Sequence, residues 1–282
     1  MLNGFELSSP ATQLLERDEA KDQVARAVES LAEELAAGRS QTLLAYLRFL
    51  ARFHEYSFRN VILVAMQRPD ASLVAGRRSW EKLGRKVKER ETPIGILAPI
   101  TKSVLVLDAE SGEDFEEDKL LGFRTVPVFD LQQTEGKPLP ALNRTLGDAT
   151  SLIPAMERVI AEADIELNYE LLRLGTNGWT DGRTITVRND LTSGDKFRCL
   201  VHELAHCLLG HLRRRGDFAA HVRETEAEAV AFVVCQAFGI DSRERSSDYI
   251  QLWDGSVETL MGSLKAVQQT AGHIIARVKE LK

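Results

Sequence analysis

The sequence has few cysteines, no long apolar run and no overall excess of basic charge. Three cysteines in 282 residues, Cys199, Cys207 and Cys235, are too few for a disulfide framework, and such sparse use favours a reducing cytosol. No apolar stretch approaches the ~20 residues that a membrane-spanning helix needs. The first residues lack the basic start and apolar run of a signal peptide. The net charge of −6 argues against a surface that is basic all over. From the few cysteines and from the lack of a signal peptide and of a membrane-spanning run, we expect a soluble cytoplasmic protein.

The composition is that of a folded protein with a substantial core. Hydrophobic residues make up 44% of the chain and charged residues 28%, which excludes global disorder. The length favours two domains. The stretch QQTEGKPLPALNRTLGD has two prolines and few large apolar side chains, so it is the best candidate for a linker. We place one domain at residues 1–145, including this linker, and the other at residues 146–282.

Hydrophobic spacing changes along the chain from helical to strand-like and back. It predicts an amphipathic helix within residues 12–37, a second helix that Ser40 can cap, and a third in SFRNVILVAMQ that ends before Pro69. From Pro93 the segments GILAPI, SVLVLD and GFRTVPVFD have the pattern of short strands. A helix in PAMERVIAEA and strands near ELNYELLRLG and RTITVR follow, and the chain beyond about residue 194 has helical spacing. The predicted class is α+β: N-terminal helices and a small antiparallel sheet, then a mainly helical part with a short sheet.

Six of the nine residues in ESGEDFEED, residues 110–118, are acidic. A solvated loop between two strands is the simplest interpretation. A second interpretation makes this loop a mimic of DNA that occupies a restriction enzyme or shields the protein's own basic face. Six acids are too few to imitate a duplex, so we favour the solvated loop.

The most specific chemical pattern is His-Glu-Leu-Ala-His at residues 202–206. Because a helix advances about 100° per residue, His202 and His206 lie on one face and can present two imidazole nitrogens to one zinc ion. Glu203 projects beside that face, where it can take a proton from a water activated by the metal. The alternative is a pair of histidines satisfied by hydrogen bonds on a core helix. We favour the metal site because a buried histidine pair next to a glutamate needs a partner to offset its desolvation.

A catalytic zinc site needs a third protein ligand, and the following residues offer two sources. His211 lies five residues after His206, which on a continuous helix rotates it about 140° away from the ligand face. The stretch RETEAEAVAFVVCQAFGI predicts a second helix that begins with Glu224, Glu226 and Glu228. We favour this helix. Helical spacing does not choose among its three glutamates, and some of them simply suit the positive end of the helix dipole.

The two segments together resemble a known family. HELAHCLLGH followed by ETEAEAVAFVV resembles the ImmA/IrrE group of zinc metallopeptidases, in which a second helix begins with Glu-Ala-x-x-x-Ala and its glutamate is the third ligand. The resemblance implies a zincin-like, gluzincin-type domain in which Glu226 joins His202 and His206 as a Zn²⁺ ligand. It also implies that Glu203 is the catalytic base. The family usually has Asn or Asp where this chain has Glu228.

The N-terminal half carries a second resemblance. Residues 56–100, from YSFRNVILV to PIGILAPI, resemble the single-stranded-DNA-binding domain of ArdC antirestriction proteins, in which a Trp-x-x-Leu-Gly segment precedes a basic turn and a strand. ArdC proteins join such a domain to a zincin domain in the same order. Residues 50–91 contain ten Lys or Arg and five Asp or Glu, a local balance of +5 within a chain of −6. Binding a DNA strand requires such basic side chains together with an exposed aromatic ring for base stacking.

These patterns indicate a candidate DNA-binding surface made of basic and aromatic residues from one segment. Its predicted members are Tyr56, Arg59, Arg77, Arg78, Trp80, Lys82, Arg85, Lys86 and Lys88. Phe58 is a further available ring. The alternative makes Trp80 and Phe58 core anchors and the charges a solvated face.

The leading interpretation is a zinc-dependent endopeptidase with a front domain that binds single-stranded DNA. The family resemblance suggests a protein or peptide substrate, such as a DNA-bound regulator cut in antirestriction or stress response. Peptide hydrolysis also needs a donor for the developing oxyanion, and Tyr249, His221 and His273 are candidates that the sequence does not rank. The competing interpretation is a non-catalytic, single-stranded-DNA-binding antirestriction protein whose zincin domain is structural.

Overall fold

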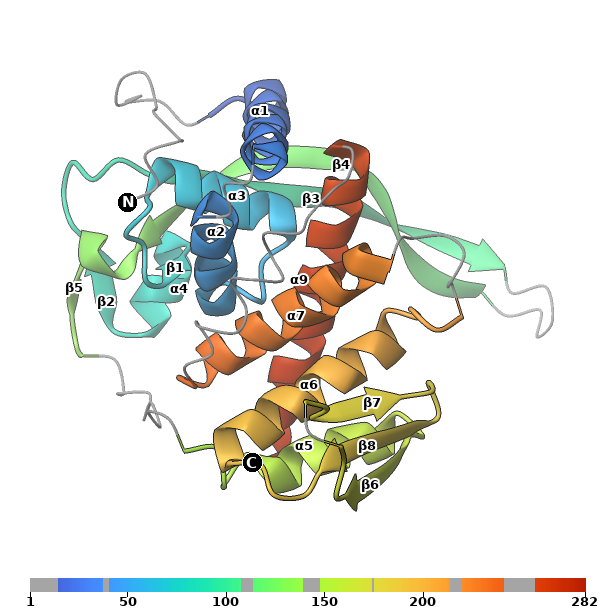
Figure 1. The fold of residues 1–282 in the computed structure, drawn as a ribbon. Helices are drawn as coiled ribbons and strands as arrows, with labels where there is room; N and C mark the ends of the chain where they lie inside the picture. The colour runs from blue at the N-terminus through green and yellow to red at the C-terminus, as the bar shows by residue number, and fades with distance from the viewer. Residues whose placement is uncertain are drawn as a thin grey trace. The chain divides into compact units, whose positions relative to one another are not determined.

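The computed structural model describes most of the chain (Figure 1). The chain divides into two compact units. The described residues are 15–37, 41–107, 114–138, 148–173, 175–213, 220–240 and 257–282. One unit contains the described residues of Ala27–Val61 and Pro140–Lys282, and the other contains those of Phe5–Arg26 and Ile62–Leu139. The predicted domain boundary near residue 145 falls outside the described residues and stays a prediction.

The predicted N-terminal helices are present, with bounds close to those expected. Helix α1 spans Arg17–Ala36, α2 spans Gln41–Arg52, and α3 spans Phe58–Gln67 and ends before Pro69 as predicted. The proposed cap of the second helix, Ser40, lies outside the described residues. Among the described helices, none combines the length and the apolar character that crossing a membrane would require.

The unit that contains the described part of Ile62–Leu139 is built on antiparallel strands. The main sheet has the order β1-β4-β3, in which β4 (Asp114–Asp130) pairs with both β1 (Val74–Ala75) and β3 (Ile94–Leu107). The sequence predicted three short strands here, but pairing continues through the exposed polar residues near Lys102, so β3 and β4 form one long hairpin. Residues 114–118 of the predicted acidic loop belong instead to β4, which begins at Asp114; residues 108–113 lie outside the described part.

Smaller elements complete this unit and bury its one tryptophan. They are α4 (Arg77–Lys82), β2 (Arg85–Val87), the 3-10 turn η1 (Leu131–Gln133) and β5 (Thr134–Gly136), with β2 and β5 paired antiparallel. The fully buried Trp80 of α4 packs with Val87 and Phe129, and its indole N–H donates to the Phe129 carbonyl at 2.9 Å. Part of the predicted linker is therefore ordered, because β5 holds residues 134–136 against β2.

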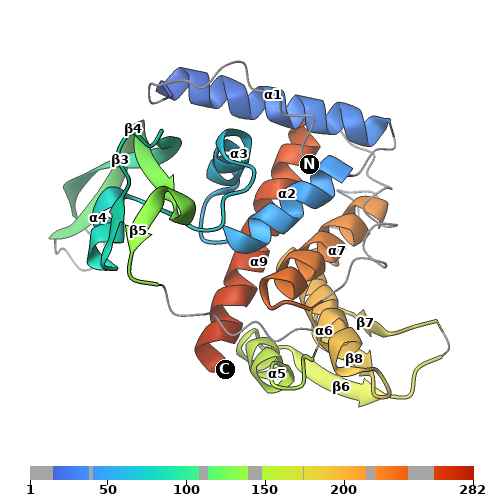
Figure 2. The ribbon, with the colours of Figure 1, turned by 90° about the vertical axis from the view of Figure 1, so that its left-hand side faces the viewer.

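The other unit is mainly helical. Besides α2 it contains α5 (Ile153–Glu162), α6 (Ser193–Leu208), α7 (Ala220–Ala237) and α9 (Val257–Leu281). Helix α7 packs against α2, α6 and α9, which is why its apolar and small residues are buried around most of its circumference (Figures 1 and 2). A helix that is apolar on all sides is stable only when neighbours cover it on all sides.

A short mixed sheet lies against α6. Its order is β6-β8-β7, with β6 (Glu166–Glu170) parallel to β8 (Thr184–Arg188) and β7 (Gly178–Thr180) antiparallel to β8. Strands near ELNYELLRLG and RTITVR were predicted here, but the short strand β7 that begins at Gly178 was not. The α+β class is confirmed, with a largely helical C-terminal part that carries a short sheet.

Candidate functional site

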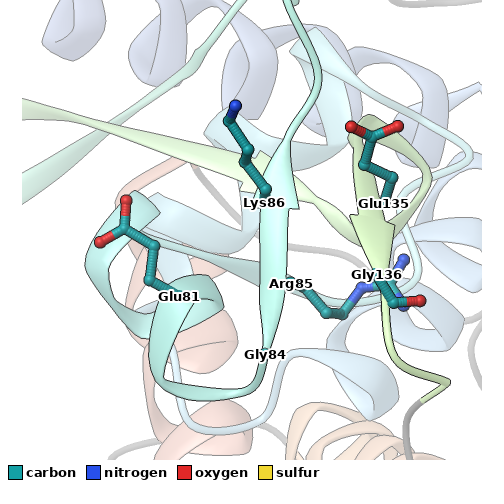
Figure 3. A pocket seen from close by; sticks show the side chains of 6 residues that line it. All are labelled: Glu81, Gly84, Arg85, Lys86, Glu135 and Gly136. Carbon is teal, nitrogen blue, oxygen red and sulfur yellow. The ribbon is translucent and has the colours of Figure 1, made fainter.

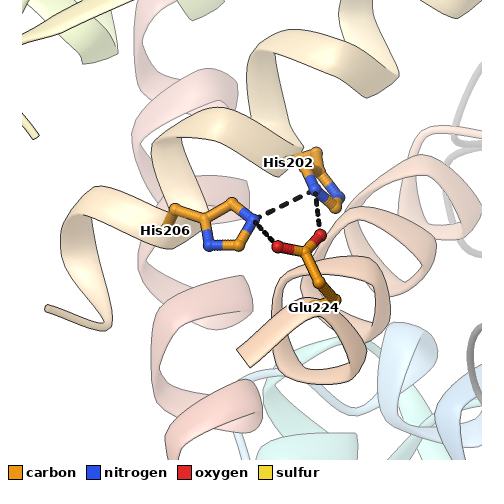
Figure 4. Close-up of side chains that lie close together, drawn as sticks. All are labelled: His202, His206 and Glu224. Carbon is orange, nitrogen blue, oxygen red and sulfur yellow. Dashed lines mark hydrogen bonds and ion pairs between the residues drawn. The ribbon is translucent and has the colours of Figure 1, made fainter. Parts of the chain in front are cut away.

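Helix α6 positions the two histidines of the His-Glu-x-x-His motif as the spacing predicts. Its N-terminus is capped by Thr192, whose hydroxyl accepts from the Asp195 N–H at 3.2 Å. One turn of helix separates His202 from His206, and their Nε2 atoms lie 3.1 Å apart (Figure 4). The two side chains therefore converge on one point outside the helix.

The acidic residue that meets these imidazoles is Glu224 of α7. Its Oε2 lies 3.5 Å from Nε2 of His202, and its Oε1 lies 3.5 Å from Nε2 of His206 (Figure 4). One ligand atom from each of the three side chains lies within 4.8 Å of the other two. The resemblance had assigned this position to Glu226, so the structure differs from the sequence analysis in which glutamate it brings to the histidines.

The rotation of α7 explains this difference. Residues two positions apart on a helix point about 200° apart, so Glu224 and Glu226 cannot face the same neighbour. Glu224 is partly exposed and faces α6, while Glu226 is buried, with its Oε2 2.9 Å from Nε2 of His211. Helical spacing left the choice among the three glutamates open, and the packing of α7 against α6 determines which one faces the imidazoles.

The donor set of this site suits a divalent cation. Two imidazole nitrogens and a carboxylate oxygen converge here, and each can offer a lone pair to a metal. Nitrogen and oxygen donors of this kind hold zinc and similar ions. Burial alone would lower the pKa of His202, but the carboxylates of Glu224 and Glu228 outweigh it and raise that pKa to about 9. Hydrogen bonding to both histidines lowers the pKa of Glu224. The carboxylates thus create a local field that attracts positive charge.

A second carboxylate supports His202 from behind. Glu228 Oε2 lies 3.4 Å from Nδ1 of His202 and 2.5 Å from a guanidinium nitrogen of Arg198. An outer carboxylate of this kind orients a ligating imidazole and raises its basicity. Neither this role of Glu228 nor Arg198 was predicted from the sequence, although Arg198 precedes His202 by one helical turn and so shares its face.

Glu203 is buried next to the histidines and next to strand β7. Burial raises its pKa, and the two neighbouring imidazoles oppose that rise. A Cβ atom at Gly178 would lie 3.1 Å from Oε1 of Glu203 and 2.5 Å from Sγ of Cys199. The strand therefore passes within van der Waals distance of the carboxylate, and a raised pKa is what a general base working near neutral pH needs.

His211 contacts the motif because α6 ends earlier than the rotation argument assumed. The helix stops at Leu208, and Gly210 adopts a left-handed conformation with φ 68°. The His211 N–H then donates to the His206 carbonyl at 3.1 Å, which is the closure typical of a helix terminated by glycine. The turn carries the His211 ring back to His206, where the two Nδ1 atoms lie 2.9 Å apart. The glycine before His211 was the available sequence signal.

The three candidate oxyanion donors have different surroundings. Tyr249 lies outside the described residues. His221 is half-buried near the start of α7, and its carbonyl accepts from the Thr225 hydroxyl at 2.8 Å. His273 is exposed on α9.

The predicted DNA-binding residues differ in exposure. Arg59, Arg77, Arg78, Lys82, Lys86 and Lys88 are exposed, Tyr56 and Arg85 are half-buried, and Trp80 and Phe58 are buried. Trp80 is therefore a core residue in this structure, as the alternative interpretation held, and both faces of its ring are covered. Trp80 is buried because α4 packs against β2 and because the indole N–H is hydrogen-bonded to the Phe129 carbonyl.

Arg85 of β2 uses its guanidinium group in hydrogen bonds to β5 and the residue after it. Its Nε donates to the Thr134 hydroxyl at 2.8 Å, and its Nη atoms donate to the carbonyls of Thr134 at 3.0 Å and Lys137 at 2.5 Å. Figure 3 shows this side chain reaching across from β2 to β5. Arg85 also lines a surface hollow of about 660 Å³. Glu81, Lys86 and Glu135 line the same hollow, so the charge there is mixed.

The fold and the site together define an α+β protein in which a helix-borne His-Glu-x-x-His motif and a glutamate from a later helix form a candidate metal centre. Residues 16–129 match the family model of the N-terminal domain of anti-restriction factor ArdC. This match confirms the resemblance to ArdC noted for the front half.

Solved structures and a curated relative extend the comparison to most of the chain. Two crystal structures of the antirestriction protein ArdC from plasmid R388, one metal-free and one with Mn(II) bound, have TM-scores of 0.53 and 0.52 at 17% and 16% identity. Each alignment covers 92% of this chain and 97% of that chain, so the two proteins share a fold. An uncharacterized protein of Bacillus anthracis is 24% identical over 289 residues, which cover 83% of this chain; the chain spans about half (47%) of that relative's length.

Proposed function

We propose that this protein is a metal-dependent peptidase joined to a region that binds single-stranded DNA, and that it acts in antirestriction. The observation that carries the peptidase proposal is the convergence of His202, His206 and Glu224 beside the buried Glu203. The likeness in fold to ArdC supports the antirestriction role. The resemblance of HELAHCLLGH to ImmA/IrrE metallopeptidases supports the choice of peptide hydrolysis.

The residues that would hold the metal are His202, His206 and Glu224. When bound, a zinc ion or another divalent cation supplies Lewis-acid chemistry that polarises a water and a carbonyl group; the ArdC crystal structure with Mn(II) supports a divalent ion, and the His/His/Glu set supports zinc. Glu203 takes a proton from the attacking water at a carboxylate oxygen and returns it to the leaving amine nitrogen. Its burial keeps bulk water away from this proton transfer.

Strand β7 supports a peptide as the substrate. It lies at the edge of the described β6-β8-β7 sheet, and its residue Gly178 packs against Glu203. An extended peptide that adds to a sheet edge is held by main-chain hydrogen bonds. A peptide paired with β7 would place a main-chain carbonyl near Glu203 without requiring one particular side chain.

The DNA-binding proposal rests on exposed basic side chains and the ArdC match. In the unit built on β3 and β4, these are Arg77, Arg78 and Lys82 of α4 together with Lys86 and Lys88 of the β2 segment. Helix α4 packs directly on β2, so these residues come from adjacent elements. We propose that they contact phosphates of a single strand.

The test of the peptidase proposal separates metal binding from catalysis. Purified full-length protein is stripped with a chelator, reloaded with Zn²⁺ or Mn²⁺, and analysed for metal content and for cleavage of a proteome-derived peptide mixture by mass spectrometry. We expect His202→Ala to lose stoichiometric metal. We expect Glu203→Gln to retain metal and to lose cleavage by about 10²- to 10⁴-fold, because only the proton acceptor is removed.

Glu170→Gln, an exposed change on β6, is the matched control and should leave both properties intact. Full metal occupancy in His202→Ala would contradict the site. Cleavage that is equally fast in Glu203→Gln, or that never depends on metal, would contradict the peptidase proposal and favour an antirestriction protein that acts by strand binding alone.

A further inference from the structure

A chain of four hydrogen-bonded side chains extends from the candidate metal centre into the core. His206 Nδ1 lies 2.9 Å from Nδ1 of His211, and Nε2 of His211 lies 2.9 Å from Oε2 of Glu226. The hydroxyl of Ser263 donates to the other oxygen of Glu226. All four side chains are buried, and they connect α6, the turn after it, α7 and α9.

The chemistry of the four groups allows the protons of this chain to be placed. An ionised carboxylate can only accept hydrogen bonds, so Glu226 must receive a proton from Nε2 of His211. A neutral imidazole carries one proton, which leaves Nδ1 of His211 as an acceptor. His206 must then donate from its own Nδ1. Acting through His211, the carboxylate of Glu226 thereby fixes the proton of His206 on Nδ1. The lone pair of His206 is then on Nε2, the atom that faces Glu224 and His202.

The surroundings of Glu226 set it apart from Glu228. Glu228 is paired with Arg198. Within the described part of the chain, the hydrogen bonds and ion pairs of Glu226 join it to His211 and Ser263 and to no Lys or Arg.

Apolar side chains cover the remaining side of Glu226. They line a cavity of about 20 Å³, too small for more than one water, and include Leu43, Leu47, Leu260 and Leu264. A buried carboxylate without a cationic partner is unfavourable. A metal cation bound by His206 would offset the negative charge of Glu226, because the imidazoles of His206 and His211 connect the two.

We propose that Glu226 and His211 are positioning residues of the metal centre, which hold His206 in the tautomer and orientation that bind the metal, with Ser263 fixing the carboxylate from α9. This inference rests on the metal site of the proposed function and adds the means by which α7 and α9 support it. It also gives a different role to Glu226, which the family resemblance identified as a direct ligand. Outer partners of this kind typically contribute 10- to 100-fold to metal affinity.

The first test assigns the protons in the metal-free protein, without any use of activity. Two-dimensional ¹H–¹⁵N correlation of the histidine side chains should show His206 protonated on Nδ1 and His211 protonated on Nε2. In Glu226→Gln the side-chain amide can donate to His211, so we expect the tautomer population of His206 to shift toward Nε2–H. A wild-type His206 that carries its proton on Nε2 overturns the proposal.

The second test measures metal affinity in the full-length protein. Competition with a chromophoric chelator gives the Zn²⁺ dissociation constant of the wild type, Glu226→Gln, Ser263→Ala and Glu258→Gln. We expect about 10- to 100-fold weaker binding for Glu226→Gln, a smaller loss for Ser263→Ala, and wild-type affinity for Glu258→Gln, which removes an exposed charge from α9. X-ray absorption of the zinc-loaded Glu226→Gln protein should show the ligand set of the wild type.

The outcomes distinguish this proposal from the metal site itself. If the wild type binds neither Zn²⁺ nor Mn²⁺, the proposed function fails, and the tautomer assignment still decides the proton placement. If the wild type binds Zn²⁺ and Glu226→Gln binds it equally well with an unchanged His206 tautomer, the positioning role is overturned. Loss of an oxygen ligand from zinc in Glu226→Gln would make Glu226 a ligand and also overturn it. Should Glu226→Gln fail to fold, Ser263→Ala and the wild-type tautomers give the same decision.

Discussion

Gly178 is a single position where the absence of a side chain brings two elements of the site together. It begins strand β7, and its backbone packs against Cys199 and Glu203 of α6. Any Cβ there would approach the Cys199 sulfur to 2.5 Å, closer than real contacts permit. Only glycine therefore allows the strand to lie beside the carboxylate that we assign as the base.

We expect Gly178→Ala to lower the free energy of unfolding by about 1–3 kcal/mol, the usual cost of overpacking a closely packed site. Urea unfolding followed by circular dichroism measures this change. Because Cys199 is the nearest obstacle, adding Cys199→Ala to the variant should restore part of the loss.

Gly262→Ala on α9 is the matched control for this substitution. A Cβ at that position meets nothing within 4 Å, and alanine is favoured over glycine within a helix by about 0.5–1 kcal/mol. Equal stability of Gly178→Ala and the wild type would contradict the close packing of β7 on α6.

The aromatic and basic residues of the front segment show why residue type alone does not assign a role. Trp80 has the same ring whether it stacks on a base or fills a core, and here it is fully buried. Arg85 has the charge of a phosphate ligand, yet its guanidinium holds β2 against β5. Burial and hydrogen-bond partners are properties of the folded chain, so the sequence analysis left these alternatives open.

At the scale of elements, the turn after α2 is joined to α9 around His54. The Nε2 of this buried histidine accepts from the Lys279 ammonium at 2.9 Å, and its carbonyl accepts from the Gln268 amide at 3.0 Å. Burial lowers the pKa of His54, and the positive charge of Lys279 lowers it further, while Glu55 opposes this shift. The neutral imidazole is thus the form that the fold accommodates.

The lowered pKa of His54 predicts that the free energy of unfolding depends on pH. Since the pKa of His54 is lower in the folded state, the unfolded chain binds more protons as the pH falls below about 6.5. The free energy of unfolding should then fall by up to about 1.4 kcal/mol per pH unit until the folded pKa is reached. Urea unfolding at pH 7.5, 6.5 and 5.5 should show a smaller decline for His54→Gln than for the wild type.

His273→Gln supplies the comparison, because His273 is exposed on the same helix, α9. It should retain the wild-type pH dependence. A His54→Gln protein that loses stability between pH 6.5 and 5.5 as steeply as the wild type would show that this histidine is not held neutral.

The strands illustrate how far pattern predicts elements. Alternating and apolar segments located the strand region after Pro93, but β3 continues through residues 101–103, whose polar side chains are exposed. Pairing with β4 satisfies the backbone there, so a break in the apolar pattern does not end the strand. Strand β7 was missed for a related reason, because a three-residue strand that begins with glycine carries a turn signal in its sequence.

At the scale of the whole molecule, charge is segregated along the chain. The chain carries −6 overall, while residues 50–91 carry +5. A region of this sign attracts the phosphate backbone of a nucleic acid, and the attraction weakens as salt displaces it.

We expect the full-length protein to bind a fluorescent oligothymidylate with an affinity that falls as salt rises. The slope of log K against log salt should be about −0.7 for each phosphate contacted. Lys82→Glu and Lys86→Glu should each weaken binding and reduce this slope, which anisotropy titrations at several salt concentrations measure. Lys265→Glu, an equal charge change at an exposed position of α9, should leave the slope close to that of the wild type.

Binding without salt dependence, or an equal effect of the Lys265 change, would contradict the assignment of the phosphate contacts to α4 and β2. Strand binding that survives Glu203→Gln is expected in either case. Strand binding therefore does not test the peptidase proposal, which only the cleavage experiment tests.

The amino-acid sequence by itself determined the α+β class, the pairing of His202 with His206, and the position of Glu203 beside them, because these follow from periodicity and from the fixed geometry of one helix. Only the tertiary structure decided that Glu224 meets the imidazoles and that Glu226 faces His211. The choice depends on how α7 is rotated about its own axis against α6 and α9. That rotation is set by the packing of side chains from several elements, which no local pattern in the sequence records.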